Sequence, residues 1–418
     1  MANTQPEQKR KLSLPALIFI GMIAGILLGI LFNTQGWGSF ATNYIKPFGT
    51  IYINLLKFLV VPVVLFSLTK GVVSLKDLRR VGAMGVKTIV YFMITTAGAV
   101  IIGLVFANVF KGIGWFPQLE TTELAYEAKS ANIMQTIVNI FPDNAVKPMV
   151  EAQMLPLIVI ALFLGAGILA SGEYGARIGK FVEDAYEVVM SIMSMIIKLS
   201  PIGVFALMLE VVAVNGAAVV GSLALVILVA YMAYLTHVLV VYGSSVKFLS
   251  HMSIGRFFKG AAPAMITAFT TTSSSATLPV SIECANKLDA EPEVAGFVLP
   301  IGSTINMDGT AIYMGVTSVF IAAAYGVELT LTQMLTIVLT ATLASIGTAG
   351  VSGAGMIMLA MVLQSVNLPV AGIALIAGVD KLFDMGRTSL NVTGDLSCTM
   401  WISRAEKLKK GEKVSWEK

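Results

Sequence analysis

The sequence has little charge for its length. Only 12% of its 418 residues are charged, whereas 56% are hydrophobic, and a soluble domain carries roughly 25% charged residues. The mean hydropathy is +0.83. This composition excludes an ordinary soluble domain and is typical of an integral membrane protein. The net charge is only +4, and no long basic run interleaved with aromatic residues is present, so we expect no binding of nucleic acid.

Cysteine and histidine are also scarce, with two of each. Cys284 and Cys398 lie in apolar stretches and form neither a disulfide framework nor a metal-ligand cluster, so we interpret them as buried thiols. His237 and His251 are too few for a histidine-rich metal site. An intramembrane serine protease is disfavoured, because neither histidine follows Ser352 of the GVSG motif in the chain and a nucleophilic serine needs a base. We therefore expect no enzyme.

Long apolar stretches are abundant. Residues 14–32 carry no charge and are long enough to cross a bilayer, since a span needs about 20 residues. This length favours a retained first helix over a signal peptide. Further apolar stretches cover residues 45–69, 85–110, 154–170, 186–212 and 216–246.

Basic segments predict the orientation of these spans. The N-terminal residues 1–11, the KDLRR loop at 76–80 and the tail KLKKGEK at 407–413 are all basic. Basic segments stay on the cytoplasmic side of a membrane. We therefore expect both termini in the cytoplasm and an even number of full crossings.

The pattern changes after residue 250, where small and polar residues interrupt the apolar stretches. Residues 256–288 contain TTTSSSATLP and residues 332–367 contain ASIGTAGVSGAG, and each segment is expected to turn back as a re-entrant hairpin. Each precedes a span with polar residues at mid-depth, at NMDGT (306–310) and at DKLFDMGRTSLNVTGD (380–395). Interrupted segments in corresponding places indicate a transporter binding site near the bilayer midplane.

Polar residues form one stripe along the expected last helix. An α-helix turns by about 100° per residue, and on this basis the six polar residues named at the end of this paragraph all lie within about 60° of one line along the helix surface. Charges inside a membrane indicate function, although a buried Asp–Arg pair that only holds helices together is an alternative. Lys381 lies at the edge of the stripe, where it is expected to pair with Asp380 or to reach the interface. The stripe consists of Asp380, Asp384, Arg387, Thr388, Asn391 and Asp395.

The charges of these segments predict a cation. Three aspartates, one lysine and one arginine of the last helix, with Asp308, sum to −2. Asn306 and Asp308 are two residues apart and cannot share a face of a regular helix, so we expect a break at Met307 or nearby. Carboxylates, amide oxygens and freed carbonyls make a site for a hard cation, and Na⁺ is the expected one.

The same stripe predicts recognition of an acidic amino acid. The guanidinium of Arg387 suits a carboxylate, and the carboxylate of Asp384 suits an ammonium group. The hydroxyl run 270–275, with the N–H groups of a hairpin tip, would bind the α-carboxylate. A hydroxyl-rich turn that only caps two half-helices is the alternative.

Four motifs, in this order, resemble the glutamate transporter family, the sodium- or proton-coupled dicarboxylate and amino-acid symporters. They are SSSATLP (273–279), NMDGT, ASIGTAGVSGAG (344–355) and DMGRTSLNVTGD (384–395). KFLVVPVVLFSL (57–68) is similar to the second helix of the family and YFMITT (91–96) to its third. The resemblance covers nearly the whole chain.

The resemblance implies an all-α integral membrane protein with eight transmembrane helices and two re-entrant helical hairpins. It also implies an inverted-repeat elevator fold, a homotrimer in contact with membrane lipid, and a place in the plasma (inner) membrane. The implied parts are scaffold helices in 1–80 and 113–213, transport-domain helices in 81–112 and 214–250, a transport core in 251–405 and a cytoplasmic tail in 406–418.

The resemblance also implies the residues of the site. The substrate contacts would be Ser274, Thr310, Val351, Gly355, Asp384, Arg387, Thr388 and Asn391. A first sodium ion would contact Gly302, Asn306, Asn391 and Asp395. A second would contact Thr304, Met307, Ser345, Ile346 and Thr348, and a third Thr95, Thr96, Asn306 and Asp308. Several of these residues would act through backbone carbonyls.

The chain departs from many amino-acid-transporting relatives at Thr272 and Met385, one of which is often arginine in the family. The presence of Arg387 favours acidic substrates, and the presence of Asp384 favours an amino group over a C4-dicarboxylate. We therefore expect a symporter of L-aspartate and L-glutamate coupled to Na⁺. A proton-coupled glutamate symporter, a cystine or C4-dicarboxylate symporter of the same fold, and a channel are the alternatives.

Overall fold

The computed structural model describes residues 14–81, 83–118, 138, 141–151, 153–345 and 353–417. Every regular element in these ranges is a helix. The N-terminal half holds α1 (Leu14–Thr34), α2 (Gly38–Phe40), η1 (Ala41–Ile45), α3 (Lys46–Val81), α4 (Ala83–Gly112), α6 (Lys147–Val150), α7 (Met154–Ala170), α8 (Gly172–Ile197) and α9 (Ser200–Asn215). The C-terminal half holds α10 (Ala218–Thr236), η2 (His237–Tyr242), η3 (Ser245–Leu249), α11 (Ile254–Thr271), α12 (Ser274–Lys287), α13 (Pro292–Ile305), α14 (Asp308–Ala324), α15 (Leu331–Ser345), α16 (Ala354–Ser365), η4 (Val370–Gly372), α17 (Ile373–Ala377) and α18 (Asp380–Lys409).

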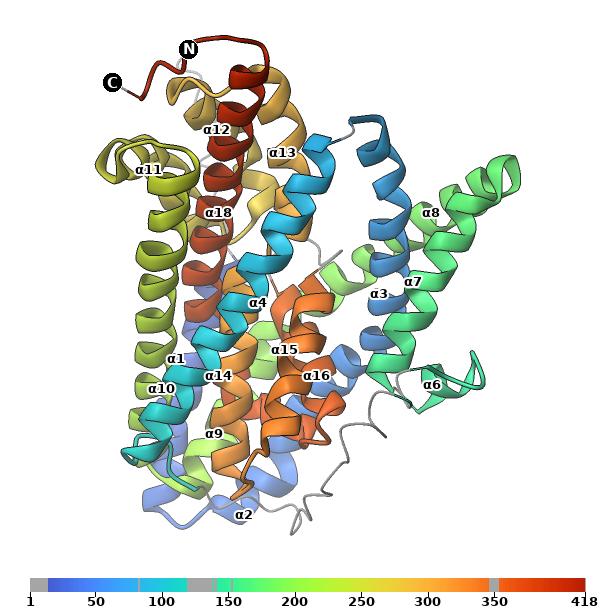
Figure 1. The fold of residues 1–418 in the computed structure, drawn as a ribbon. Coiled ribbons are helices and arrows are strands. Elements are labelled where there is room, and N and C mark those ends of the chain that lie inside the picture. Colours follow the sequence, from blue (N-terminus) through green and yellow to red (C-terminus); the bar gives the residue numbers. More distant parts are fainter. Residues whose placement is uncertain are drawn as a thin grey trace, which may run out of the picture.

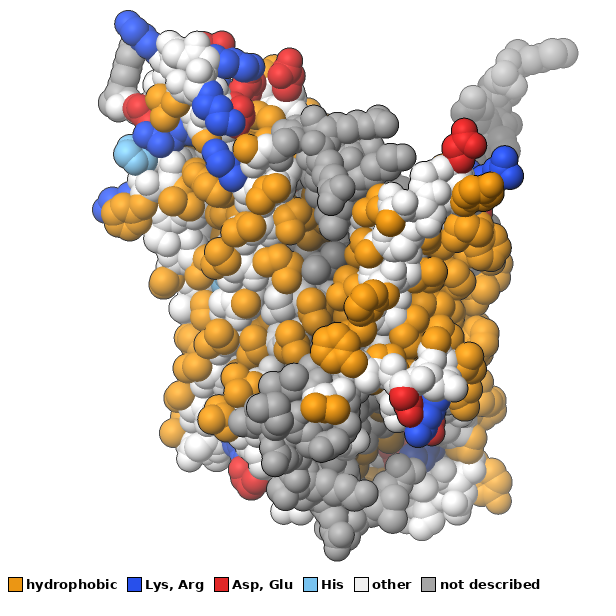
Figure 2. Space-filling view, turned by 45° about the vertical axis from the view of Figure 1, so that its right-hand side comes forward, with side chains coloured by type: hydrophobic (Ala, Val, Ile, Leu, Met, Phe, Trp, Pro, Cys, Tyr) orange, Lys and Arg blue, Asp and Glu red, His pale blue; other side chains and the backbone are white. Residues whose placement is uncertain are grey.

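Several of these helices have the length and hydropathy of membrane spans. Within the described ranges, five helices qualify, or six if one bent pair counts as a single span. Figure 2 shows apolar side chains over the middle of one face and most of the charged ones near its ends. Such a surface suits the hydrocarbon of a bilayer. The chain is thus a multi-pass membrane protein, and the predicted number of eight spans stays a prediction.

The stretch 186–212, which we expected to be one span, is divided between two helices. Helices α8 and α9 meet at an angle of 51°. Pro201 stands in the first turn of α9. A proline lacks the N–H group that would continue the helix, and its ring collides with the carbonyl of the fourth residue before it. If residues 186–212 form one span, that span is bent, and the predicted single span stays a prediction.

The KDLRR segment at 76–80 is helical, not a loop. Helix α3 continues without interruption to Val81. The segment contains neither glycine nor proline, and leucine, lysine and arginine all favour the helix. Basic composition alone predicted the side of the membrane and wrongly suggested a loop.

The predicted turn in the first interrupted segment is confirmed. Helices α11 and α12 pack against each other and are joined by Thr272 and Ser273. Thr272 adopts the left-handed conformation, with φ of 54°. The Ser273 hydroxyl accepts a hydrogen bond from the Ala276 N–H at 3.2 Å and caps α12. Part of the hydroxyl run therefore has the capping role that was the alternative interpretation.

The second interrupted segment is flanked by α15 and α16, which also pack against each other. Residues 346–352, at the centre of this segment, lie outside the described residues.

The predicted break in the NMDGT span is confirmed. Helix α13 ends at Ile305 and α14 begins at Asp308, with Asn306 and Met307 between them in non-helical conformations. All residues of α14 are buried. Helix α18, red in Figure 1, packs along α13 and α14, so both half-helices face its polar stripe.

Candidate functional site

The polar stripe predicted for the last helix is buried along α18. The six residues of the stripe are between 2% and 5% exposed. Helices α11, α12, α13 and α14 all contact α18. Charged side chains in such a position need partners or a ligand. An unpaired charge that is buried in a protein or in a membrane is unfavourable by several kcal/mol.

Arg387 is bound by two carboxylates of its own helix. Its Nη1 lies 3.1 Å from Asp380 Oδ1 and its Nε 2.9 Å from Asp384 Oδ1. The guanidinium also lies over the ring of Tyr313, 4.7 Å from the centroid. A Cβ atom added at Gly355 would lie 2.5 Å from the guanidinium carbon, so the start of α16 passes directly over it. The predicted carboxylate-binding fork is therefore held in place, with hairpin residues of the second segment against it.

Lys381 does not reach the interface, and that expectation is wrong. Its residue is only 9% exposed. The ammonium contacts the hydroxyl of Thr272 at the α11–α12 turn and lies 3.5 Å from Asp384 Oδ2. The turn covers the first residues of α18, which explains why the lysine is enclosed.

A second polar group lies farther along α18, about 10–16 Å from Asp384 at 1.5 Å per residue. The amide nitrogen of Asn306 donates to the Asn391 carbonyl and to Asp395 Oδ1, both at 2.9 Å. The Gly309 N–H donates to Asn391 Oδ1 at 2.7 Å. A Cβ added at Gly302 would collide with the Asp395 carboxylate. The structure thus brings together the four residues predicted for the first ion.

Asp308 lies at the start of α14 and accepts hydrogen bonds from three side chains. The Thr96 hydroxyl donates to its Oδ1 at 2.5 Å, and the Tyr242 hydroxyl donates to its Oδ2 at 2.7 Å. His237 Nε2 lies 3.1 Å from the same Oδ2. Asp308 and His237 are fully buried. The structure thus brings together Thr96 and Asp308, two of the residues predicted for the third ion.

His237 and Tyr242 are site residues that the sequence reasoning missed. Both belong to the π-helical segment η2. The signal was available, because an ionisable residue inside an apolar stretch such as 216–246 is itself a functional hypothesis. From the sequence we used the two histidines only to argue against a metal site and against a serine protease.

The oxygen atoms of the second polar group, around Asn306, fit a cation. Asn306 Oδ1 is buried and has no hydrogen-bond partner among the described residues. An oxygen without a donor, next to carboxylates and carbonyls, suits a hard cation. Among the described residues no group of three or more His, Cys, Asp or Glu side chains could hold a metal ion.

The other predicted site residues differ in their exposure and in their contacts. Met307 Sδ lies 3.3 Å from Asn391 Nδ2. The Thr304 side chain is exposed and donates to the Ile301 carbonyl. Ser274, Thr310, Thr388, Thr95 and Ser345 are buried. Val351, Ile346 and Thr348 lie outside the described residues.

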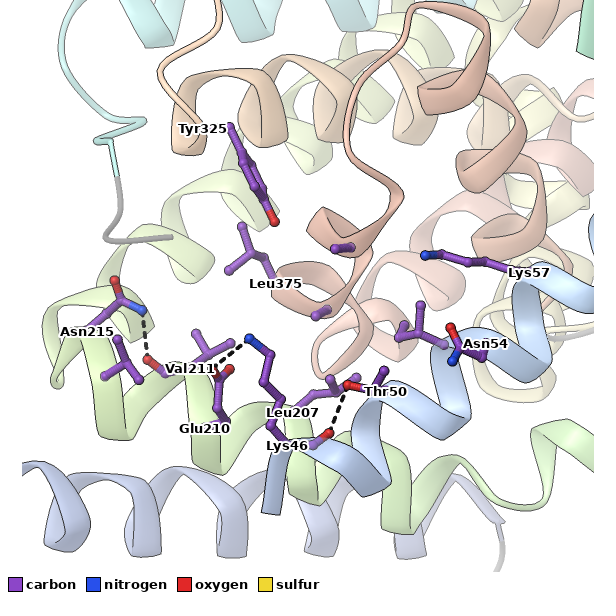
Figure 3. A pocket seen from close by; sticks show the side chains of 14 residues that line it. Lys46, Thr50, Asn54, Lys57, Leu207, Glu210, Val211, Asn215, Tyr325 and Leu375 are labelled. Carbon is purple, nitrogen blue, oxygen red and sulfur yellow. Dashed lines mark hydrogen bonds and ion pairs between the residues drawn. The ribbon is translucent and has the colours of Figure 1, made fainter. Parts of the chain in front are cut away.

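A pocket of about 170 Å³ lies apart from this site, between α3, α9 and α17. Figure 3 shows Lys46 paired with Glu210 on one wall, with Lys57 and Tyr325 on others. The Lys46 Nζ to Glu210 Oε1 distance is 3.3 Å. None of the described residues that line this pocket belongs to the predicted site.

The family whose sequence model matches residues 14–405 is the sodium:dicarboxylate symporter family. The proton/sodium-glutamate symport protein of Geobacillus stearothermophilus is 34% identical over 405 residues, covering 95% of each chain. The proton/glutamate-aspartate symporter of Escherichia coli is 34% identical over 409 residues, covering 95% of this chain and 93% of its own. A C4-dicarboxylate transport protein of Rhodopseudomonas palustris is 33% identical over 410 residues, covering 96% and 90%.

Proposed function

Because the chain belongs to the sodium:dicarboxylate symporter family, a family of membrane symporters and not of enzymes, we propose that it takes up L-aspartate and L-glutamate together with Na⁺. The chain is a transporter of the glutamate and dicarboxylate class, as its relatives' names indicate. The choice of acidic amino acids rests on one observation. Arg387 and Asp384 lie side by side in the buried stripe of α18 and offer a carboxylate-binding and an ammonium-binding group one helical turn apart.

The polar groups around Asn306 support Na⁺ as the coupled ion. Asn306 Oδ1 has no donor among the described residues. The side-chain nitrogen of Asn306 donates to Asp395 Oδ1, and Asp308 follows Asn306 by two residues in the chain. Amide, carbonyl and carboxylate oxygens bind Na⁺ as they bind other hard cations. Two of the three relatives above have names that include the proton, so coupling to a proton is the competing proposal.

We place the moving part of the transporter in residues 81–112, 214–250 and 251–405, and the fixed scaffold in residues 1–80 and 113–213. The moving part would carry the substrate and the ion past the scaffold, as an elevator, within a homotrimer in the plasma (inner) membrane with both termini in the cytoplasm. The buried contact of α18 with α13 and α14 supports a single rigid carrier for these helices.

Uptake by purified protein in liposomes tests this proposal. Radiolabelled L-aspartate and L-glutamate are offered under an imposed inward Na⁺ gradient, and separately under an inward proton gradient without Na⁺. Accumulation that requires Na⁺ is the expected result. Accumulation driven by the proton gradient alone would overturn the choice of ion and keep that of substrate. Accumulation of succinate or cystine, without aspartate or glutamate, would overturn the choice of substrate.

A further inference from the structure

The ammonium group of Lys381 occupies the side of Asp384 that Arg387 leaves open. Arg387 Nε lies against Asp384 Oδ1, whereas Lys381 Nζ lies 3.5 Å from Asp384 Oδ2. The same ammonium contacts the Thr272 hydroxyl, which in turn donates to the Thr271 carbonyl at 2.6 Å. Lys381 therefore links the turn between α11 and α12 to the carboxylate at the centre of the stripe.

This arrangement leaves the four charges at the start of α18 balanced. Asp380 and Asp384 carry two negative charges, and Lys381 and Arg387 carry two positive charges. All four are at most 9% exposed. An acidic amino acid brings one ammonium group of its own, and that group needs the oxygen of Asp384 beside which Lys381 already lies.

Taking the proposed function as its basis, we propose that Lys381 is a specificity-determining residue, a tethered ammonium group that stands in the place of the substrate ammonium at Asp384. An amino-acid substrate must displace it. A dicarboxylate without an amino group leaves the Lys381–Asp384 contact intact and meets an Asp384 whose negative charge the lysine already compensates.

Lys381 therefore reduces the preference of the site for amino acids over dicarboxylates. It competes with the ammonium group of aspartate, which weakens aspartate binding. It also screens Asp384, which would otherwise repel the two carboxylates of succinate at short range in a buried site. Removing its charge is expected to change the two affinities in opposite directions, which general damage to the fold does not do.

The test compares binding of L-aspartate and succinate by wild-type protein and by Lys381→Met, measured by calorimetry in Na⁺ buffer with purified, membrane-reconstituted protein. In Lys381→Met, aspartate should bind more tightly and succinate more weakly. The ratio of their dissociation constants should change by about tenfold or more, which corresponds to about 1.4 kcal/mol. Lys381→Arg, which keeps a cation, should change the ratio less. Lys57→Met, which removes a lysine that lines the separate pocket of α3, should leave it unchanged.

The outcomes separate this inference from the proposed function. Wild-type protein that binds neither compound would overturn both. Wild-type binding combined with an unaltered ratio in Lys381→Met, or with a parallel loss of both affinities, would overturn the role of Lys381 alone. A ratio that changes equally in Lys57→Met would also overturn it, because the effect would then reflect net charge.

Discussion

Asp308 illustrates how single residues prepare the candidate site. Three side chains from α4 and η2 contact its two carboxylate oxygens, and two of them, Thr96 and Tyr242, are hydroxyl donors. Since Tyr242 already donates to Oδ2, His237 is placed as a second donor to the same oxygen. The carboxylate is thereby fixed in orientation before any cation arrives, which is the property expected of a pre-organised ligand.

We predict that His237→Leu raises the Na⁺ concentration for half-maximal aspartate uptake by about fivefold, because a hydrogen bond contributes about 1 kcal/mol. His237→Gln keeps a donor near the position of Nε2 and should stay close to the wild type. Uptake titrated with Na⁺ in liposomes measures both. Equal behaviour of the two variants would show that the hydrogen bond to Asp308 does not position the carboxylate.

We also predict the effect of removing the Arg387 side chain. Arg387→Ala leaves Asp380 and Asp384 without the guanidinium, and loss of one member of a buried ion pair destabilises a protein by about 3–5 kcal/mol. Both the melting temperature and aspartate uptake should fall.

The double variant Asp380→Asn, Arg387→Ala removes one charge of each sign and should recover most of the melting temperature. Its aspartate uptake should remain as low as that of Arg387→Ala. Recovery of uptake together with stability would mean that Arg387 only neutralises its neighbours and does not bind the substrate.

Sequence reasoning reached the residues that obey a periodicity. The stripe of α18 follows from about 100° per residue, and the break at Met307 follows from two polar residues that cannot share a helical face. The roles of Lys381, His237 and Tyr242 could not be predicted from such a periodicity. Their roles depend on which distant segment packs against them, the α11–α12 turn in one case and α14 in the other, and no local pattern contains that information.

At the scale of elements, close approach of helices holds the candidate cation site together. Gly103 of α4 lies so near α14 that an added Cβ atom would be 2.8 Å from the Ile312 carbonyl oxygen. Thr96, two turns earlier on α4, donates to Asp308 at the start of α14. The tight crossing at Gly103 therefore helps to set the separation of the two helices that share Asp308.

Gly103→Ala should lower the melting temperature and raise the Na⁺ requirement, because overpacking against a backbone typically destabilises by about 1–3 kcal/mol. Gly98→Ala, on the same helix, is the matched control. A Cβ at Gly98 meets nothing within 4 Å, and alanine favours the helix over glycine by about 1 kcal/mol. Comparable loss of stability in both variants would contradict a specific role for the α4–α14 approach.

The element boundaries were predicted less well than the polar motifs. The bend between α8 and α9 was not predicted, and the KDLRR segment, which we expected to be a loop, is helical. Hydropathy reports whether a stretch is apolar and says little about where it bends, while a basic segment can be a helix end as easily as a loop. Proline at 201 was the available signal for the bend.

At the scale of the whole molecule, the C-terminal segment packs back onto the chain. Trp416 is 3% exposed, and its indole N–H donates to the Ser250 carbonyl at 2.9 Å. Lys407 Nζ lies over the Trp416 ring and donates to the Asp289 carbonyl at 2.7 Å. Trp416 and Val414 belong to an apolar cluster with residues of α11 and α18. This end of the chain thus ties the base of the α11–α12 hairpin to the end of α18.

Trp416→Ala should lower the melting temperature by an amount typical of a large buried side chain, since such truncations destabilise by about 3–5 kcal/mol. Trp37→Ala is the control, because Trp37 is 51% exposed. Thermal unfolding of the purified variants in the same detergent measures both. A larger effect of Trp37→Ala would show that the packing of the C-terminal segment contributes little.

The docked end of the chain has a practical consequence for protein engineering. An affinity tag or a fluorescent reporter fused directly to Lys418 would be separated from the buried Trp416 by only two residues. A bulky, rigid fusion at that position would compete with the packing of Trp416 and strain the hairpin that it secures. A flexible glycine–serine spacer of about 10 residues, which spans roughly 16–19 Å on average, would let the reporter stand clear of the protein.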